Sequence, residues 1–105
     1  MTNQDIDRRL ALAIGWTKNQ MQLDTNGNVF LLRDGLGGKY WRFFDHTNPA
    51  VIWPIAERFD AFPLAAPPDG KWRVFPMCDF NSAALHKVAA TASALAVIKY
   101  VESKK

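Results

Sequence analysis

The sequence predicts an α+β protein in which an antiparallel sheet of about four strands packs with three helices. Segments near both ends of the chain and one in its middle place apolar residues at helical spacing. Between them lie short runs rich in Val, Phe, Leu, Trp and Tyr, separated by turn signals. The length of 105 residues predicts a single domain, residues 1–105, with one modest core.

The first helix is predicted in the segment IDRRLALAIGW, where Ile6 and Leu10 recur at helical spacing. Asp5 and Asp7 favour its N-terminal end, and Gly15 supplies a C-terminal stop. Asn26-Gly27 and a glycine cluster at 35–38 then mark turns. An antiparallel meander of three strands is therefore expected at about 17–23, 29–33 and 39–44.

A second helix is predicted at about 49–59, with Pro49 just inside its start. Pro54 follows one turn later, directly after Trp53, and a proline inside a helix removes one backbone hydrogen bond. The exit AFPLAAPPDG is expected to be an extended loop, because it contains three prolines and a glycine. KWRVFPM, at 71–77, alternates in the manner of a strand covered on more than one side.

The last segment, HKVAATASALAVIKYV, is expected to form a helix that is apolar on almost every face. Such a helix must be enclosed by its own sheet and by something else, for which a second copy of the chain is expected in a protein this short. We therefore predict a homo-oligomer, either a dimer or a larger assembly. Asn81-Ser82 precedes this segment and fits either its N-cap or a pair of polar ligands.

Composition predicts a globular protein in a reducing compartment. Hydrophobic residues make up 49% and charged residues 22% of the chain, and the net charge of +3 is spread without blocks. Cys78 is the single cysteine, which excludes a disulfide framework and a CxxC metal pair. The first residues lack the apolar run of a signal peptide, and no run has the length of a membrane span, so neither a membrane nor a secreted location is expected.

Catalysis and metal binding are not predicted. P-loop, GxGxxG, HExxH and GxSxG motifs do not occur in the sequence. His46 with Asp45 as a base and its orienting acid, or His86 with Cys78 and Asp79 as a thiol catalyst, could be imagined. Near-adjacent residues rarely form such pairs, so we expect His46 at a helix entrance and His86 on an exposed turn. No catalytic residue, metal or cofactor is therefore assigned.

Cations close in sequence to aromatic residues predict binding of an anion that carries a flat ring. The cations are Lys18, Lys39, Arg42, Lys71, Arg73, Lys87 and Lys99, and the aromatic residues are Trp16, Trp41, Trp72, Phe75, Phe80 and Tyr100. The alternative is that the rings form the core and the cations are solvated. Lys99 argues most strongly for a ligand, because a charge within an apolar helix needs a partner, an anion or a route to the rim of a site.

Three stretches, in order, resemble the phage ABA-sandwich domain family. HTNPAVIWPIAERF resembles its run S-T-D-I-A-A-A-W-E-V-V-E-K, and IDRRLALAIGW is similar to its opening helix ending in M-G-W or L-G-W. ATASALAVIKY looks like its closing helix A-D-T-A-P-L-A-I-C-R-A. The matching residues are Thr47, Ala50, Trp53, Ile55 and Glu57 in the first stretch, Ile14-Gly15-Trp16 in the second, and Leu95, Ala96, Val97 and Lys99 in the third.

The chain departs from the family at three of these positions. Pro54 replaces a helix-favouring residue, Ala94 stands where proline is usual, and Lys99 where arginine is common. Lysine lacks the planar fork with which arginine grips a phosphate. The resemblance implies that Trp53 anchors the middle helix to the sheet and that the ring of Pro54 faces solvent or a loop.

The resemblance also implies a function. The family includes phage anti-Thoeris proteins, homo-oligomers that bind and sequester cyclic ADP-ribose signals of bacterial TIR-domain enzymes without cleaving them; some also hold cyclic oligonucleotides. Lys99 then contacts the phosphate, Asn81 is a polar contact ahead of the last helix, Trp72 stacks on the adenine, and Lys18 is a second cation. Only Lys99 is in register with a family motif.

The leading hypothesis is therefore a phage-encoded sponge for a cyclic nucleotide immune signal, acting in the host bacterial cytoplasm. The alternative is a small phage structural or protein-interaction domain without a small-molecule ligand. A nucleic-acid binder that uses the basic aromatic strands ranks below both.

Overall fold

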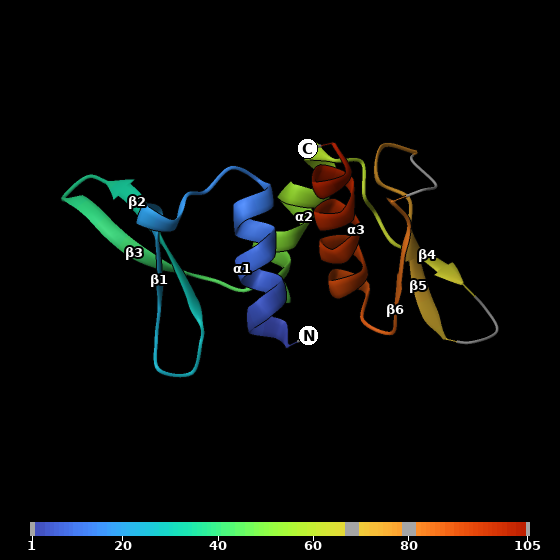
Figure 1. The fold of residues 1–105 in the computed structure, drawn as a ribbon, viewed down its shortest axis with the longest axis horizontal. Coiled ribbons are helices and arrows are strands. Elements are labelled where there is room, and N and C mark those ends of the chain that lie inside the picture. The colour runs from blue at the N-terminus through green and yellow to red at the C-terminus, as the bar shows by residue number, and fades with distance from the viewer. Residues whose placement is uncertain (1, 67–69, 79–81, 105) are drawn as a thin grey trace.

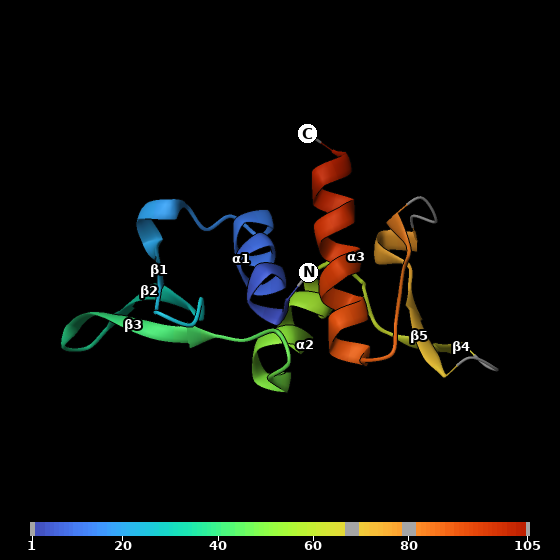
Figure 2. The same cartoon turned by 60° about the horizontal axis from the view of Figure 1, so that its bottom comes forward.

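The computed structural model describes residues 2–66, 70–78 and 82–104. In this part of the chain, three α-helices form a central layer with a three-stranded antiparallel sheet on either side (Figures 1 and 2). The first sheet has the order β1-β2-β3 and the second β4-β5-β6. The elements in chain order are α1 Asn3–Ala13, the 3₁₀ turn η1 Lys18–Gln20, β1 Met21–Leu23, β2 Val29–Gly35, β3 Gly38–Phe44, α2 Pro49–Arg58, β4 Leu64–Ala66, β5 Lys71–Val74, η2 Pro76–Cys78, β6 Ala84–His86 and α3 Ala89–Ser103.

The expected α+β class with three helices and antiparallel strands is confirmed, but the strands are divided between two sheets instead of forming one sheet of four. The predicted meander corresponds to β1, β2 and β3. The predicted strand at 71–77 is β5, and it pairs with β4 and β6, its neighbours along the chain. The strands separate because α2 leads the chain from one side of the helical layer to the other (Figure 1).

The ends of α1 are set by short-range contacts. The Thr2 hydroxyl accepts a hydrogen bond from the backbone N–H of Asp5, whose carboxylate accepts one from the Thr2 N–H. The bond that the Thr2 backbone N–H donates to the Asp5 carboxylate is the main reason that the pKa of Asp5 lies below its usual value. The predicted stop is confirmed, since Gly15 has a φ of 112° that favours glycine.

Helix α3 is the centre of the protein. It packs against α1 and α2 on one side and against β5 and β6 on the other. Ala92, Ala94 and Ala96 are fully buried, and such small residues let neighbouring elements approach closely. The enclosure that the sequence analysis assigned to a second copy is therefore supplied by the chain itself.

The start of α3 differs from the prediction. The helix begins at Ala89 with Val88 as its N-cap, and β6, which was not predicted, lies between Ser82 and this start. Asn81-Ser82 is therefore not the N-cap of α3, and Asn81 lies outside the described residues. The local reason is that residues 84–86 pair with β5 before the chain turns into the helix.

Helix α2 runs through Pro54 without interruption. Its N-cap is Asn48, whose side-chain oxygen accepts the backbone N–H of Ala50 at 3.0 Å. Trp53 is half-buried and packs against the core, whereas Pro54 is exposed. Core packing of Trp53 and exposure of Pro54 agree with what the resemblance implies. The element that α2 mainly packs against is the helix α3, so the implied anchoring of Trp53 to a sheet stays a prediction.

Residues 29–44, which comprise β2, β3 and the turn between them, form an arm that points away from the helices (Figure 1). Its base is anchored, because Val29, Leu31 and Phe44 are buried in the core. Beyond that base the strands are solvent-exposed, and Trp41 and Phe43 expose 43% and 47% of their surface. The arm therefore carries large aromatic residues that the core does not bury.

Candidate binding site

A pocket lies between the helix-facing side of the arm, the end of α1 and the flank of α2. Its volume is about 180 Å³, and it is lined by residues of β2, β3 and α2 and by residues that follow α1. The residues of its wall include Trp16, Arg33, Arg42, Ala50 and Pro54. It brings together three segments that are distant in the sequence.

The strand register places both arginines on the helix-facing side of the arm. Arg42 lies opposite Leu31, whose side chain is buried in the core, and Arg33 lies two residues further along the same strand as Leu31. The guanidinium carbon of Arg33 lies 5.0 Å from the centroid of the Trp16 ring, a cation–π distance. Two cations and an indole are thereby held at one opening.

Neither Arg33 nor Arg42 forms an ion pair with a carboxylate within the described part of the chain. Both side chains are exposed, so they are available to an anion. Arginine offers five N–H donors in a planar fork that matches the oxygens of a phosphate or carboxylate. The pocket can therefore bind an anion directly and place a ring beside Trp16.

Pro54 belongs to the pocket wall and removes one regular backbone hydrogen bond of α2 there. Because proline has no N–H, it cannot donate the hydrogen bond that the carbonyl of Ala50, four residues earlier, would accept in a regular helix. Both residues line the pocket. The Trp53-Pro54 pair thus has one member in the core and one at the candidate site.

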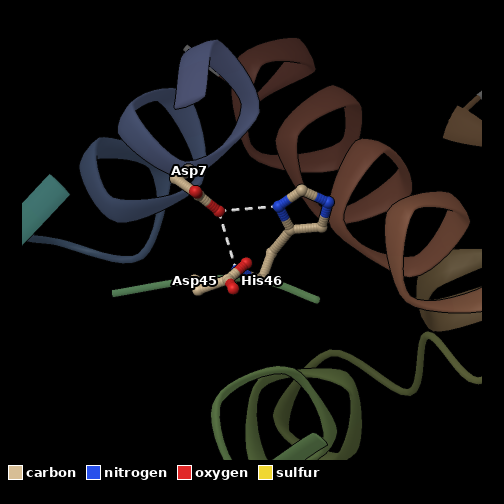
Figure 3. A group of neighbouring side chains, drawn as sticks. All are labelled: Asp7, Asp45 and His46. Atoms are coloured by element: carbon tan, nitrogen blue, oxygen red, sulfur yellow. Dashed lines mark hydrogen bonds and ion pairs between the residues drawn. The ribbon is translucent and has the colours of Figure 1, made fainter. Parts of the chain in front are cut away.

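A second polar group is buried among the helices. The imidazole Nδ1 of His46 lies 2.6 Å from Asp7 Oδ1 (Figure 3). Its Nε2 lies 2.9 Å from the Thr91 hydroxyl. The backbone N–H of His46 also donates to Asp7 Oδ1 at 2.7 Å. The three residues come from α1, the segment before α2, and α3, so this network joins all three helices.

The Asp7–His46–Thr91 network has the residue types of a catalytic triad, but it is closed to a substrate. His46 exposes 0% of its surface, Asp7 3% and Thr91 2%. A nucleophile must reach the reacting atom of its substrate, and this hydroxyl is enclosed by the core. The network is therefore a structural connection, and His46 at the entrance of α2 agrees with its predicted place.

Asp45 lies next to this network. One carboxylate oxygen of Asp45, one of Asp7 and one ring nitrogen of His46 lie within 4.8 Å of one another, which raises the question of a metal site. Two ligands bound to one zinc ion at about 2.1 Å in tetrahedral geometry stand about 3.4 Å apart. Asp7 Oδ1 and His46 Nδ1 are closer than this, at 2.6 Å, because they are hydrogen-bonded to each other. Asp45 itself accepts two hydrogen bonds from Thr47. The geometry is that of a hydrogen-bonded group instead of a metal site.

Of the four ligand-binding residues predicted from the sequence, the three that the structure describes, Lys18, Trp72 and Lys99, do not line this pocket. Lys18 lies in η1 beside the first sheet, and Trp72 lies in β5 of the second sheet, on the other side of the helices (Figure 1). Lys99 is exposed on α3, and its Nζ donates to the carbonyl oxygen of Ala83 at 2.7 Å. Asn81 lies outside the described residues.

Lys99 and Trp72 are nevertheless on the same side of the molecule. The contact with Ala83 draws the Lys99 amine toward the chain that leads into β6, and Trp72 pairs with His86 of that strand. Lys99 thus has a polar partner within its own chain, as a charge on an apolar helix requires. A separate phosphate site at this end stays a prediction.

Sequence reasoning named Trp16 and Arg42 among its cations and aromatic residues, but not Arg33. The available signal was that side chains of a strand point alternately to its two faces. With the register of β2 and β3 around their turn, this alternation puts Arg33 and Arg42 on one face. Asp7 as the partner of His46 was missed as well. A separation of 39 positions in the sequence offers no local signal for that contact.

Comparisons with known proteins add no relative: no family model, no curated protein and no solved structure matches the chain. The resemblance to the phage ABA-sandwich domain therefore stays a prediction. Among the described residues, no helix has both the length and the apolar character needed to cross a membrane.

Proposed function

We propose that this chain is a non-enzymatic binding protein for a small anionic ligand that carries a flat ring, as a nucleotide does. The observation that supports this most is the pocket in which Arg33 and Arg42 stand beside Trp16. Charged hydrogen bonds from a guanidinium are about twice as strong as neutral ones. An aromatic surface adds stacking energy for a base.

The pocket volume limits how much of a ligand one chain encloses. About 180 Å³ is less than the roughly 300–1,000 Å³ of pockets that surround a whole small molecule. It accommodates a phosphate and part of the attached group, while the remainder of the ligand lies outside. The proposed pocket is thus one subsite of a larger binding surface.

Sequestration of a cyclic nucleotide immune signal is the specific form of this proposal. It rests on the resemblance to phage anti-Thoeris proteins, and it places the chain in the cytoplasm of a host bacterium. A protein that withholds a signal needs slow release and no chemistry. The enclosed His46 group is compatible with this role, because it cannot reach a ligand.

The test is calorimetry and thermal-shift measurement with cyclic ADP-ribose isomers and cyclic oligonucleotides. A ligand that binds the native state raises its melting temperature by mass action. Arg33→Ala and Arg42→Ala are each expected to weaken binding by at least about tenfold, since a charged hydrogen bond contributes about 1.5–3 kcal/mol. Heat release should return the ligand intact.

Arg8→Ala is the matched control, because Arg8 is an exposed arginine of α1 outside this pocket. Lys99→Ala separates the two candidate sites. Loss of binding in Lys99→Ala but not in Arg33→Ala would move the site to α3. If no ligand in the panel raises the melting temperature, the proposal of a nucleotide sponge fails.

The second candidate function is a protein-interaction domain without a small-molecule ligand. It is favoured by the arm, on which Leu36, Tyr40, Trp41 and Phe43 are exposed beyond the anchored base. Large exposed apolar residues grouped on one element mark interaction surfaces. A chain that associates through the arm and ignores every nucleotide would support this function over the first.

A further inference from the structure

We infer that β3 is the dimer interface of this protein, where it pairs antiparallel with β3 of a second copy. Within the described residues, β3 pairs on one side with β2 and forms the edge of the first sheet on the other. The strand has seven residues, Gly38–Phe44, and all but the last are exposed. An exposed edge of this length presents a row of unpaired N–H and C=O groups to another strand.

Symmetry restricts how two copies of β3 can pair. Antiparallel copies are related by a twofold axis, so one residue must lie opposite its own equivalent. Trp41 is the middle residue of Gly38–Phe44. Full overlap of the seven residues therefore places Trp41 opposite Trp41 of the partner subunit.

This register avoids contacts between like charges. Lys39 lies opposite Phe43 of the partner subunit, and Arg42 lies opposite Tyr40 of the partner subunit. Each cation of the strand thus faces an aromatic ring, a pairing that is attractive when the cation lies over the ring. If the axis passed through Arg42 instead, two guanidinium groups would be opposed.

The two faces of the arm then have different roles. Phe30 and Phe43, whose ring centroids are 5.5 Å apart, lie on the outer face with Trp41, and the second copy extends this aromatic surface across the axis. Arg42 lies on the helix-facing side, at the pocket proposed above. Tyr40 of the partner subunit would stand beside it, so the second copy adds a ring to a pocket that is too small to enclose a nucleotide alone.

Sedimentation velocity over a concentration series, without ligand, tests the interface. The wild-type chain should show a monomer–dimer equilibrium. Trp41→Lys should weaken it by at least about tenfold, because each substitution opposes two ammonium groups on the axis and removes two large rings. Leu36→Lys is the matched control, because Leu36 is the fully exposed residue of the turn next to β3 and should leave the equilibrium unchanged.

Disulfide trapping tests the register and does not depend on the fold of the lysine variant. In a Cys78→Ser background, Trp41→Cys should form a disulfide-linked dimer under mild oxidation, because directly opposed residues have Cα atoms about 4.5–5.5 Å apart, within disulfide range. Leu36→Cys should not form one. A wild-type chain that stays monomeric at every concentration overturns the inference, and equal trapping at both positions overturns the register.

The dimer and the ligand site can fail separately. Sedimentation is measured without ligand. Of the two arginine variants used in the ligand test, Arg42→Ala is on the paired strand, so the separation relies on Arg33→Ala, which is on β2 and not on the paired edge. A dimer that binds no nucleotide would therefore confirm this inference and reject the proposed sponge.

Discussion

The helical centre and the arm of this protein use apolar residues in opposite ways. The centre encloses alanines of α3 completely and contains a hydrogen-bonded polar network, Asp7–His46–Thr91. The arm carries some of the largest side chains of the sequence and leaves Trp41 and Phe43 nearly half exposed. Large rings are usually the residues that bury the most surface on folding.

The comparison indicates that folding stability resides mainly in the centre, whereas the arm carries the residues to which we assign the proposed recognition. Small residues permit the close approach of α1, α2 and the second sheet to α3, and the energy of that packing does not require the arm beyond its base. The exposed rings of the arm contribute little to a monomer. They gain most of their burial only when a ligand or a second strand covers them.

The largest effect is expected from breaking the buried network. His46→Ala leaves the Asp7 carboxylate and the Thr91 hydroxyl buried without their partner and adds a cavity. We expect the free energy of unfolding, measured by urea denaturation, to fall by about 3–5 kcal/mol, the range found when one partner of a buried polar pair is removed.

His86→Ala is the control, since it removes the other histidine of the chain. His86 is half-buried at the end of β6 and accepts one hydrogen bond from the Val88 N–H. Its loss should cost less than about 1 kcal/mol. Equal losses in the two variants would show that the network does not connect the helices as described.

A gain is expected from a second buried hydroxyl of α3. Ser93 is fully buried, and within the described residues its Oγ has no hydrogen-bond partner. Ser93→Ala removes an unsatisfied polar group at almost unchanged volume, so unfolding should require about 1 kcal/mol more. Thr91→Val tests the contrast in the same helix, because it removes a hydroxyl that is bonded to His46; stabilisation by both variants would contradict the network.

The sequence predicted those parts of the fold that depend on residues close together in the chain. The three helices, the meander and the stop at Gly15 follow from spacing and turn residues, which act over a few positions. The second sheet was missed because β4 and β6 are only three residues long. Their sequences, LAA and ALH, show no alternation of polar and apolar residues. The enclosure of α3 was assigned to a second copy because periodicity reveals that a face is covered, but not by what.

The candidate site was predicted less well for the same reason. A list of cations and aromatic residues includes Arg42 and Trp16, but only the register of β2 and β3 selects them and adds Arg33. Lys99 was singled out for its apolar surroundings, whereas its amine is satisfied by a carbonyl 16 residues earlier in the chain. Contacts between distant residues, which spacing does not reveal, therefore define the pocket and the partner of Lys99, and the predicted role of Lys99 toward a ligand stays a prediction.

The smallest effect on stability is expected in the arm. Trp41→Ala, measured at concentrations where the chain is monomeric, should change the free energy of unfolding by less than about 1 kcal/mol, because much of the ring is already in water. Ile52→Ala is the matched truncation in the centre, where Ile52 is fully buried, and should cost about 2–5 kcal/mol. If Trp41→Ala destabilised the monomer as much as Ile52→Ala, the arm would be part of the folding core, and its exposed rings could not be assigned to recognition.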